Sequence, residues 1–244
     1  MNSDSNKYLI CESLLDSKIE LSSKFIDVLA LLDDDDQKLL LSNSTVYNFS
    51  QGSVIYAEGD IPQNLMFLNT GKVKIFKNGV DHKKQIIRLI KQGWFFGYRA
   101  MLADDDFYQS SSAAFEESQI IFIPKEIIND LIHRNHELSN LFIHILASNL
   151  AKSNDHTLIL TQKHLRGRLA SAILILEETY GFENDGKTLS ARIPRGDLAE
   201  LANMNIANTS RVLGEFVKEG MVSIYRRTIC ILDKKTLERT SVIG

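Results

Sequence analysis

The chain of 244 residues contains only two cysteines, Cys11 and Cys230, which lie near its opposite ends. Two thiolates cannot supply four cysteine ligands within one chain, so the sequence excludes an all-cysteine zinc site and a four-cysteine iron–sulfur cluster. The low cysteine count also argues against a disulfide scaffold. We therefore expect reduced thiols and a hydrophobic core as the main source of stability.

Long apolar runs are also missing. The longest unbroken ones, residues 28–32 and 172–176, fall far short of a membrane-spanning helix. The first residues, from Met1 to Lys7, lack the charged-then-apolar pattern of a secretion signal. We expect a soluble, cytoplasmic protein with no membrane partner.

Neither sign of charge dominates, but the charge is unevenly distributed. Lys and Arg number 28 against 31 Asp and Glu, which gives a net charge of −3. Residues 1–160 hold 15 basic and 21 acidic side chains, whereas residues 161–244 hold 13 basic and 10 acidic ones. A basic C-terminal third on an acidic body indicates a polyanionic partner for that third.

Short strands punctuated by glycine are predicted between residues 45 and 124. The candidates cover residues 45–49, 54–57, 65–69, 72–76, 85–90, 94–96, 112–115 and 119–123. Many short strands at near-regular spacing are typical of an antiparallel barrel or sandwich.

Residues 1–44 are expected to be helical or irregular. The run from Asp33 to Asp36 suits the N-terminus of a helix, where carboxylates interact favourably with the helix macrodipole. A metal site is the alternative, but four adjacent carboxylates do not converge on one ion by themselves. We therefore expect no metal site.

Beyond Pro124 the sequence predicts helices. A short helix over residues 125–134 precedes a long one from about residue 137 to residue 160. The apolar face of the long helix needs a partner, which is either the protein's own barrel or the same helix of a second subunit. That face consists of Leu138, Leu141, Phe142, Ile145, Leu146 and Leu150. The candidate contacts with a second subunit are Leu138, Leu141, Phe142, Ile145, Leu146 and Asn149.

The last third predicts a helix-turn-helix. A helix over residues 163–181 is followed by helices over residues 195–202 and 206–219, which are joined by a turn of three residues, 203–205. Strands over residues 222–225 and 228–232 then form a small hairpin with Arg226 and Arg227 at its tip.

Three stretches, taken in order, resemble the Crp/Fnr family of bacterial transcription regulators. They are residues 52–60 with 65–76 (GSVIYAEGD and LMFLNTGKVKIF), residues 96–102 (FGYRAML), and residues 198–204 with 209–220 (LAELANM and TSRVLGEFVKEG). The resemblance spans about residues 45–235. It implies an α+β fold with an N-terminal antiparallel, jelly-roll-like β-roll sensor domain, a long dimerisation helix and a C-terminal winged helix-turn-helix.

The resemblance also implies a domain plan and partners. An N-terminal helical segment (1–44) would precede a cyclic-nucleotide-binding-like β-roll effector domain (45–135), a dimerisation helix (136–162) and a DNA-binding domain (163–244). A homodimer would bind a two-fold symmetric site on double-stranded DNA and relay an effector signal to it. RNA polymerase would be a further partner.

Asn205, Asn208 and Arg211 recur every three residues near the start of the second short helix. Asn pairs bidentately with adenine and Arg with guanine. Arg211 matches the arginine that the family uses for base or phosphate contact, whereas Ala207 and Ile206 depart from the family's glutamate and arginine, which implies a different DNA half-site.

Phosphate contacts are expected from Arg195, Thr209, Ser210, Lys218, Arg226 and Arg227, with His164, Arg166 and Arg168 as weaker candidates.

The resemblance places the sensing site around residues 97–112. Cyclic-AMP-binding members hold the nucleotide with a glycine–glutamate pair and a later arginine–serine pair. Here Tyr98 stands where the glutamate would be and the arginine is missing, so we expect no cyclic AMP binding in that mode. The effector is either an unidentified small molecule or absent, and the candidate contacts for one are Gly97, Tyr98, Arg99, Ser110, Ser111 and Ser112.

Other cofactors of the family are not expected. Cys11 alone cannot hold an iron–sulfur cluster, and His82 lies in a predicted turn between strands, which argues against haem. The cofactor is therefore unknown.

A dimeric, sequence-specific transcription regulator is the favoured function. The alternative is a small-ligand-binding signalling module whose C-terminal domain contacts proteins. An enzyme is not supported, because the sequence has neither a GxxxxGK[ST] phosphate loop nor an HExxH metal motif.

Overall fold

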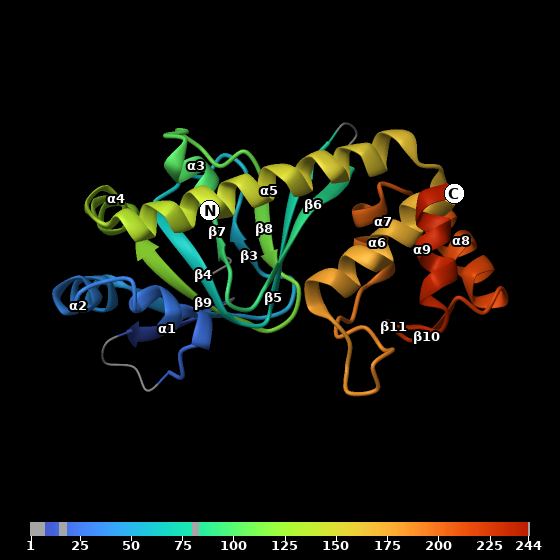
Figure 1. The fold of residues 1–244 in the computed structure, drawn as a ribbon, viewed down its shortest axis with the longest axis horizontal. Helices are drawn as coiled ribbons and strands as arrows, with labels where there is room; N and C mark the ends of the chain where they lie inside the picture. Colours follow the sequence, from blue (N-terminus) through green and yellow to red (C-terminus); the bar gives the residue numbers. More distant parts are fainter. Residues whose placement is uncertain (1–7, 15–18, 80–82, 244) are drawn as a thin grey trace, which may run out of the picture. The chain divides into compact units, whose positions relative to one another are not determined.

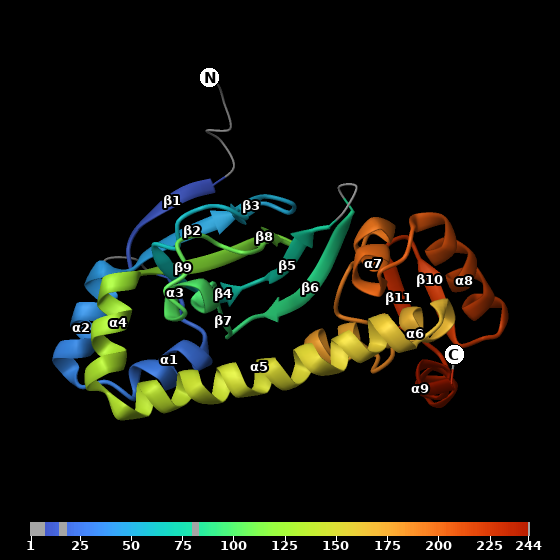
Figure 2. The ribbon, with the colours of Figure 1, turned by 90° about the horizontal axis from the view of Figure 1, so that it is seen from above.

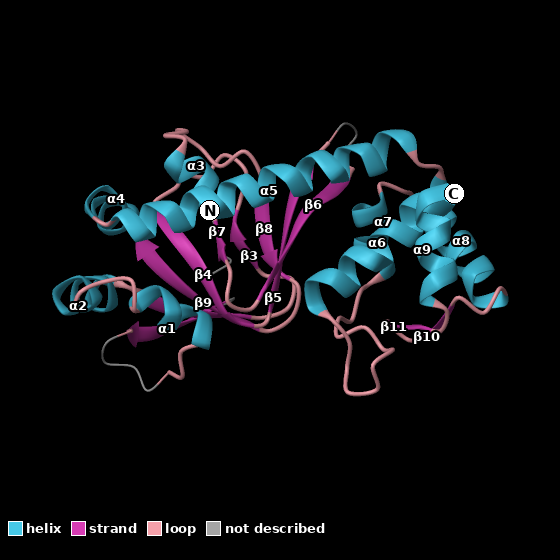
Figure 3. Cartoon of the chain, in the orientation of Figure 1, coloured by secondary structure: helices cyan, strands magenta, loops and turns pink. Residues whose placement is uncertain are grey.

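The computed structural model describes residues 8–14, 19–79 and 83–243 (Figure 1). The chain forms two compact units, one from residues 1–77 and 88–148 and the other from residues 78–87 and 149–244. Most strands belong to the first unit, and helices dominate the second (Figure 3). None of the helices in the described ranges combines the length and apolar character that crossing a membrane requires.

The first unit contains two β-sheets, which form the expected β-roll. The pairs β1–β2, β2–β9, β4–β9, β4–β7, β3–β8 and β5–β8 are all antiparallel. The five-stranded sheet has the order β1 (Tyr8–Ser13), β2 (Thr45–Phe49), β9 (Ser118–Pro124), β4 (Asn64–Thr70) and β7 (Phe95–Phe96). The four-stranded sheet has the order β3 (Val54–Tyr56), β8 (Ser111–Ala114), β5 (Lys72–Asn78) and β6 (Lys84–Lys91).

β4 is apolar on both faces because both faces are covered. Successive side chains of a strand point to opposite sides. Leu65 and Phe67 belong to a core shared with helices, whereas Met66 and Leu68 belong to a second core that includes residues of both sheets. An unbroken apolar run, rather than an alternating one, is the pattern that such two-sided burial demands.

Helices α1 (Ser23–Leu29), α2 (Asp34–Asn43) and α4 (Lys125–Arg134) contribute to the core on one face of the five-stranded sheet. α2 begins as the aspartates predicted, because the Asp33 side chain accepts a hydrogen bond from the Asp36 backbone N–H at 2.9 Å. Asp36 then pairs with Arg134 of α4 at 2.8 Å, and the two helices lie side by side (Figures 1 and 2). The helix start is confirmed.

The N-terminal segment differs from its prediction, because residues 8–13 form β1 and pair with β2. A helical or irregular structure was expected there, since the short apolar run has no clear periodicity. The strand forms because the edge of β2 offers backbone hydrogen-bond partners. Two helices also went unpredicted, α3 (Tyr98–Leu102) and α9 (Lys234–Ile243).

α5 (His136–Gln162) uses two different faces. Leu138 and Phe142 are buried in the core of the first unit, which favours the chain's own fold over a second subunit as their partner. Leu141 and Ile145 pack against the same core. Another apolar face remains exposed, with Ile143 at 60%, Leu146 at 39% and Leu150 at 65% of their full exposure.

The second unit has a core of its own. Side chains from every element contribute to it, and they include Leu169, Ile173, Leu198, Val212, Phe216, Val222, Ile229 and Leu237. The elements that supply this core are α6 (Leu165–Tyr180), α7 (Arg195–Ala202), α8 (Ile206–Lys218), β10 (Val222–Tyr225), β11 (Thr228–Ile231) and α9. The predicted helix-turn-helix with a following hairpin is therefore confirmed.

The turn between β4 and β5 leads to a stability prediction. Gly71 has φ +92, and a Cβ there would lie 2.4 Å from the backbone oxygen of Glu117. Gly71→Ala is therefore expected to lower the free energy of unfolding by about 3 kcal/mol, since backbone strain and overlap add. Gly52→Ala is the matched control, because Gly52 has φ +83 with open space around it, and should cost only about 1–2 kcal/mol. Urea unfolding measures both, and equal losses would contradict the overlap.

Candidate nucleic-acid interface and sensing site

α7 and α8 are joined by a tight turn that the sequence encodes locally. Asn203 adopts the left-handed conformation (φ 51, ψ 53), which asparagine tolerates better than most residues. Asn205 then caps α8, because its Oδ1 accepts a hydrogen bond from the Asn208 backbone N–H at 2.7 Å. Val212 and Phe216 anchor the opposite face of α8 in the core.

The exposed face of α8 is turned slightly from the predicted one. Ala207, Ser210 and Arg211 are exposed, whereas Asn208 is only partly so. Thr209 is fully buried and its hydroxyl donates to the Asn205 backbone oxygen at 2.9 Å. The expected phosphate contact from Thr209 is therefore wrong for this conformation, because that side chain points into the domain.

Arg211 lies in a network of ion pairs that links α8 to α6. Its Nη1 is 2.6 Å from Oε1 of Glu215, and the other oxygen of Glu215 is 3.0 Å from Nη1 of Arg166. Nη2 of Arg166 lies 2.7 Å from Oε2 of Glu219, and the Glu219 carboxylate raises the pKa of Arg166. Arg166 is thus engaged within the domain rather than poised for phosphate, and Arg168 likewise donates to the Asn203 oxygen at 3.0 Å.

The hairpin of β10 and β11 presents two arginines. Tyr225 pairs with Thr228, so Arg226 and Arg227 form the two-residue tip, and both are exposed. Arg226 has φ 56, a left-handed conformation that favours glycine.

The remaining predicted contacts lie at helix ends. Lys218 is exposed in the last turn of α8, where a cation interacts favourably with the helix macrodipole. Arg195 is the first residue of α7 and is partly buried, and burial lowers its pKa.

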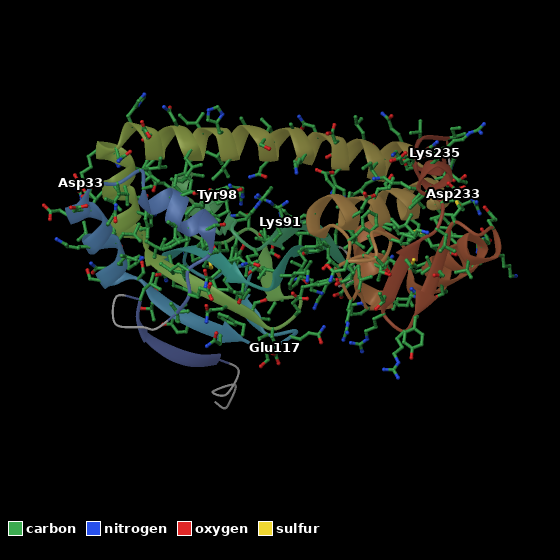
Figure 4. All side chains as sticks on the ribbon, turned by 60° about the horizontal axis from the view of Figure 1, so that its bottom comes forward. Asp33, Lys91, Tyr98, Glu117, Asp233 and Lys235 are labelled. Atoms are coloured by element: carbon green, nitrogen blue, oxygen red, sulfur yellow. The ribbon has the colours of Figure 1, made fainter. Side chains whose placement is uncertain are left out.

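In the first unit, Tyr98 begins α3 and is buried (Figure 4). Its hydroxyl accepts a hydrogen bond from Nη1 of Arg88, whose guanidinium lies 5.5 Å from the Tyr98 ring centroid. The Nη2 of Arg88 is buried and has no hydrogen-bond partner among the described residues. Arg88 was not predicted, although an arginine inside the otherwise apolar stretch 86–90 is the kind of departure that could have identified it.

Tyr56 and Tyr108 stack next to this arginine, with ring centroids 3.9 Å apart. Burial raises the pKa of Tyr56 to about 12, against the smaller, lowering effects of Ser110, Ser112, Arg88 and Arg99. Tyr56 therefore stays a neutral hydroxyl at physiological pH. The hydroxyl of Ser112 is buried and, like Nη2 of Arg88, has no hydrogen-bond partner among the described residues. Tyr98 joins this cluster through its hydrogen bond with Arg88.

The other predicted sensing residues serve local structure. Gly97 precedes α3 with φ +79 and lets the chain turn into that helix. The Ser111 hydroxyl accepts the Glu58 backbone N–H at 2.9 Å, and Arg99 pairs with Asp105 at 3.4 Å near the surface. His82 lies outside the described residues. No group of three or more His, Cys, Asp or Glu side chains in the described ranges is arranged to hold a metal ion.

Both units match known families. Residues 46–135 match the family model described as cyclic nucleotide-binding domain, and residues 167–240 match the one described as Crp-like helix-turn-helix domain. The global nitrogen regulator of Nostoc sp. is 26% identical over 198 residues, which cover 80% of this chain and 88% of that protein. The anaerobic regulatory protein of Bacillus subtilis is 24% identical over 213 residues, which cover 87% and 90% of the two chains.

The fold is also similar to that of a solved structure. The structure of FixK2 from Bradyrhizobium japonicum matches with a TM-score of 0.73 at 17% identity, covering 82% of this chain and 98% of that one. With the two domains in family order and the helix-turn-helix geometry described above, the chain belongs to the Crp/Fnr family of transcription regulators and carries a Crp-like helix-turn-helix DNA-binding domain.

Proposed function

We propose that this regulator works as a homodimer that binds a two-fold symmetric DNA site through α8 of each subunit. The observation that carries the proposal is the exposed face of α8. There Arg211 stands beside the exposed Ala207 and Ser210 and the partly exposed Gly214, three small residues that let the helix approach base edges closely. A major groove admits one helix, and arginine is its commonest reader of guanine.

The phosphate contacts would flank this face. Ser210 and Lys218 lie on α8, Arg195 begins α7, and Arg226 and Arg227 form the hairpin tip. Such contacts fix the orientation of a protein on DNA without reading its sequence. Thr209 is buried and is therefore not one of the proposed phosphate contacts.

The exposed face of α5 supports the dimer. Ile143, Leu146 and Leu150 are spaced by three and four residues, as in the seam of a two-stranded coiled coil. A second copy of α5 would remove these side chains from water. Among the residues predicted to contact a second subunit, we keep Leu146 as a proposed dimer contact. Leu138 and Phe142 are buried within the subunit and are not proposed as dimer contacts.

The β-roll would sense an effector other than cyclic AMP in the family's usual mode. That mode needs a carboxylate for the ribose hydroxyl, whereas the Tyr98 hydroxyl already accepts a hydrogen bond from Arg88. Arg88 would be the cation of the site, together with the hydroxyls of Ser110, Ser112 and Tyr56. A contact with RNA polymerase and a cytoplasmic location, where bacterial DNA lies, follow from the same function.

Ile143→Lys tests the dimer. A lysine in the seam would be an unpaired buried charge, so the dissociation constant of the dimer should rise about 100-fold or more. Leu158→Lys is the control, since Leu158 is 51% exposed but lies off this heptad. Sedimentation velocity measures the oligomeric state, and an intact Ile143→Lys dimer would refute this seam.

Arg211→Ala tests the DNA contact. Selection of genomic fragments by the wild-type protein should first enrich a symmetric motif. Arg211→Ala should then bind that site about 5- to 150-fold more weakly and lose preference at one base pair, because one bidentate contact is lost. Arg239→Ala removes the same charge from exposed α9 and should retain the preference. No enriched motif, together with binding that barely weakens as salt rises, would favour the protein-contact alternative.

Cyclic AMP should not stabilise the protein. A ligand at 100 times its dissociation constant adds about 2.7 kcal/mol to the free energy of unfolding. Cyclic AMP at about 1 mM would therefore raise the unfolding midpoint visibly if its dissociation constant were about 10 μM. We expect the same midpoint with cyclic AMP, with 5′-AMP and with buffer, and a rise with cyclic AMP alone would contradict the proposed selectivity.

A further inference from the structure

We infer that Glu215 determines how strictly Arg211 discriminates between bases, and that Arg166 positions Glu215 for this task. The inference rests on the proposed DNA-binding function and goes beyond it, because it assigns specificity to two residues that need not touch DNA. The observation is a single carboxylate shared by two arginines, one exposed on α8 and one on α6.

The two oxygens of Glu215 have separate partners. Oε1 lies 2.6 Å from Nη1 of Arg211, and Oε2 lies 3.0 Å from Nη1 of Arg166. The Glu215 side chain is 35% exposed and that of Arg211 57%, so the carboxylate is the more buried member of the pair. Hydrogen bonds between charged groups are shorter and stronger than neutral ones, which fixes both side chains.

A guanidinium that an ion pair holds in one orientation discriminates between bases better than a mobile one does. Arginine carries five N–H donors in a planar fork, and the contact with Glu215 uses Nη1 only. The remaining donors, on Nη2 and Nε, can still meet the two acceptors of guanine. Because the contact favours one orientation of the fork, swinging the side chain to meet a base with a different acceptor pattern costs the energy of that contact.

Arg166 keeps the carboxylate in place. Its guanidinium lies 5.1 Å from the Phe216 ring centroid and bridges Glu215 and Glu219. With Arg166 present, Glu215 cannot follow Arg211 toward the DNA. Arg166 is therefore a positioning residue, and its substitution should act only through Glu215.

Glu219 provides a matched control. It lies one turn beyond Glu215, is also acidic, and also pairs with Arg166, at 2.7 Å. Among the described residues it makes no ion pair with Arg211. Glu215→Gln and Glu219→Gln thus remove the same charge from the same end of α8, but only the first releases Arg211.

The experiment measures affinity for the site that the wild-type protein selects and for versions with each base pair changed in turn. Both glutamine variants should bind random DNA more tightly, because a negative charge is lost near phosphate. Only Glu215→Gln should lower discrimination, by about five-fold, at the base pair where Arg211→Ala lowers it, with other positions unchanged.

Arg166→Gln should lower discrimination at that same base pair. In the Glu215→Gln background it should add nothing, since coupled residues are not additive. Thermal unfolding of each variant checks the fold, and surface ion pairs contribute little to it.

The failures are distinguishable. If the wild-type protein selects no site, the proposed function fails and the inference falls with it. If it selects a site and Glu215→Gln keeps the wild-type discrimination, or Glu219→Gln loses as much, the inference alone is overturned.

Discussion

Burial of the five-stranded sheet on both faces is the constraint on which the first unit depends. Leu65 and Phe67 need helices on one side, and Met66 and Leu68 need the second sheet on the other. Tyr98 contacts elements on both sides of this sheet. Its hydroxyl accepts a hydrogen bond from Arg88 on β6, and its ring centroid lies 6.3 Å from that of Phe142 on α5. Any change in the Arg88–Tyr98 hydrogen bond therefore acts on a ring that also packs against the long helix.

The apolar pattern of α5 was compatible with packing on the chain's own fold and with packing on a second subunit, and α5 shows why. Residues spaced by three and four lie on one helix face, but α5 carries two such sets, one with Leu138 and Phe142 and one with Ile143 and Leu146. The first set is buried in the core that the five-stranded sheet shares with the helices, and the second is exposed. The sequence pattern could not separate them, because periodicity gives a face and not the surface that covers it.

Local patterns predicted the fold well, since β2, α4, α7 and β10 begin and end at the expected residues. What they missed depends on distant neighbours. β1 exists because β2 offers an edge, and Arg88 meets Tyr98 only once β6 and α3 are placed. Thr209 was assigned to phosphate from its polarity, whereas the rotation of α8, set by Val212 and Phe216, turns it inward.

The network around Glu215 shows the same limit at the functional site. The sequence predicted a DNA contact for Arg211 and a weaker phosphate contact for Arg166, but not the ion pair of Arg166 with Glu215, because nothing local pairs residues 166 and 215. Two acidic side chains at a DNA-facing surface weaken binding to every phosphate backbone alike. A regulator must distinguish one site from a vast excess of others, so the ratio of affinities matters more than affinity itself. A carboxylate that lowered non-specific binding while it held the arginine proposed to read a base would improve that ratio in both ways.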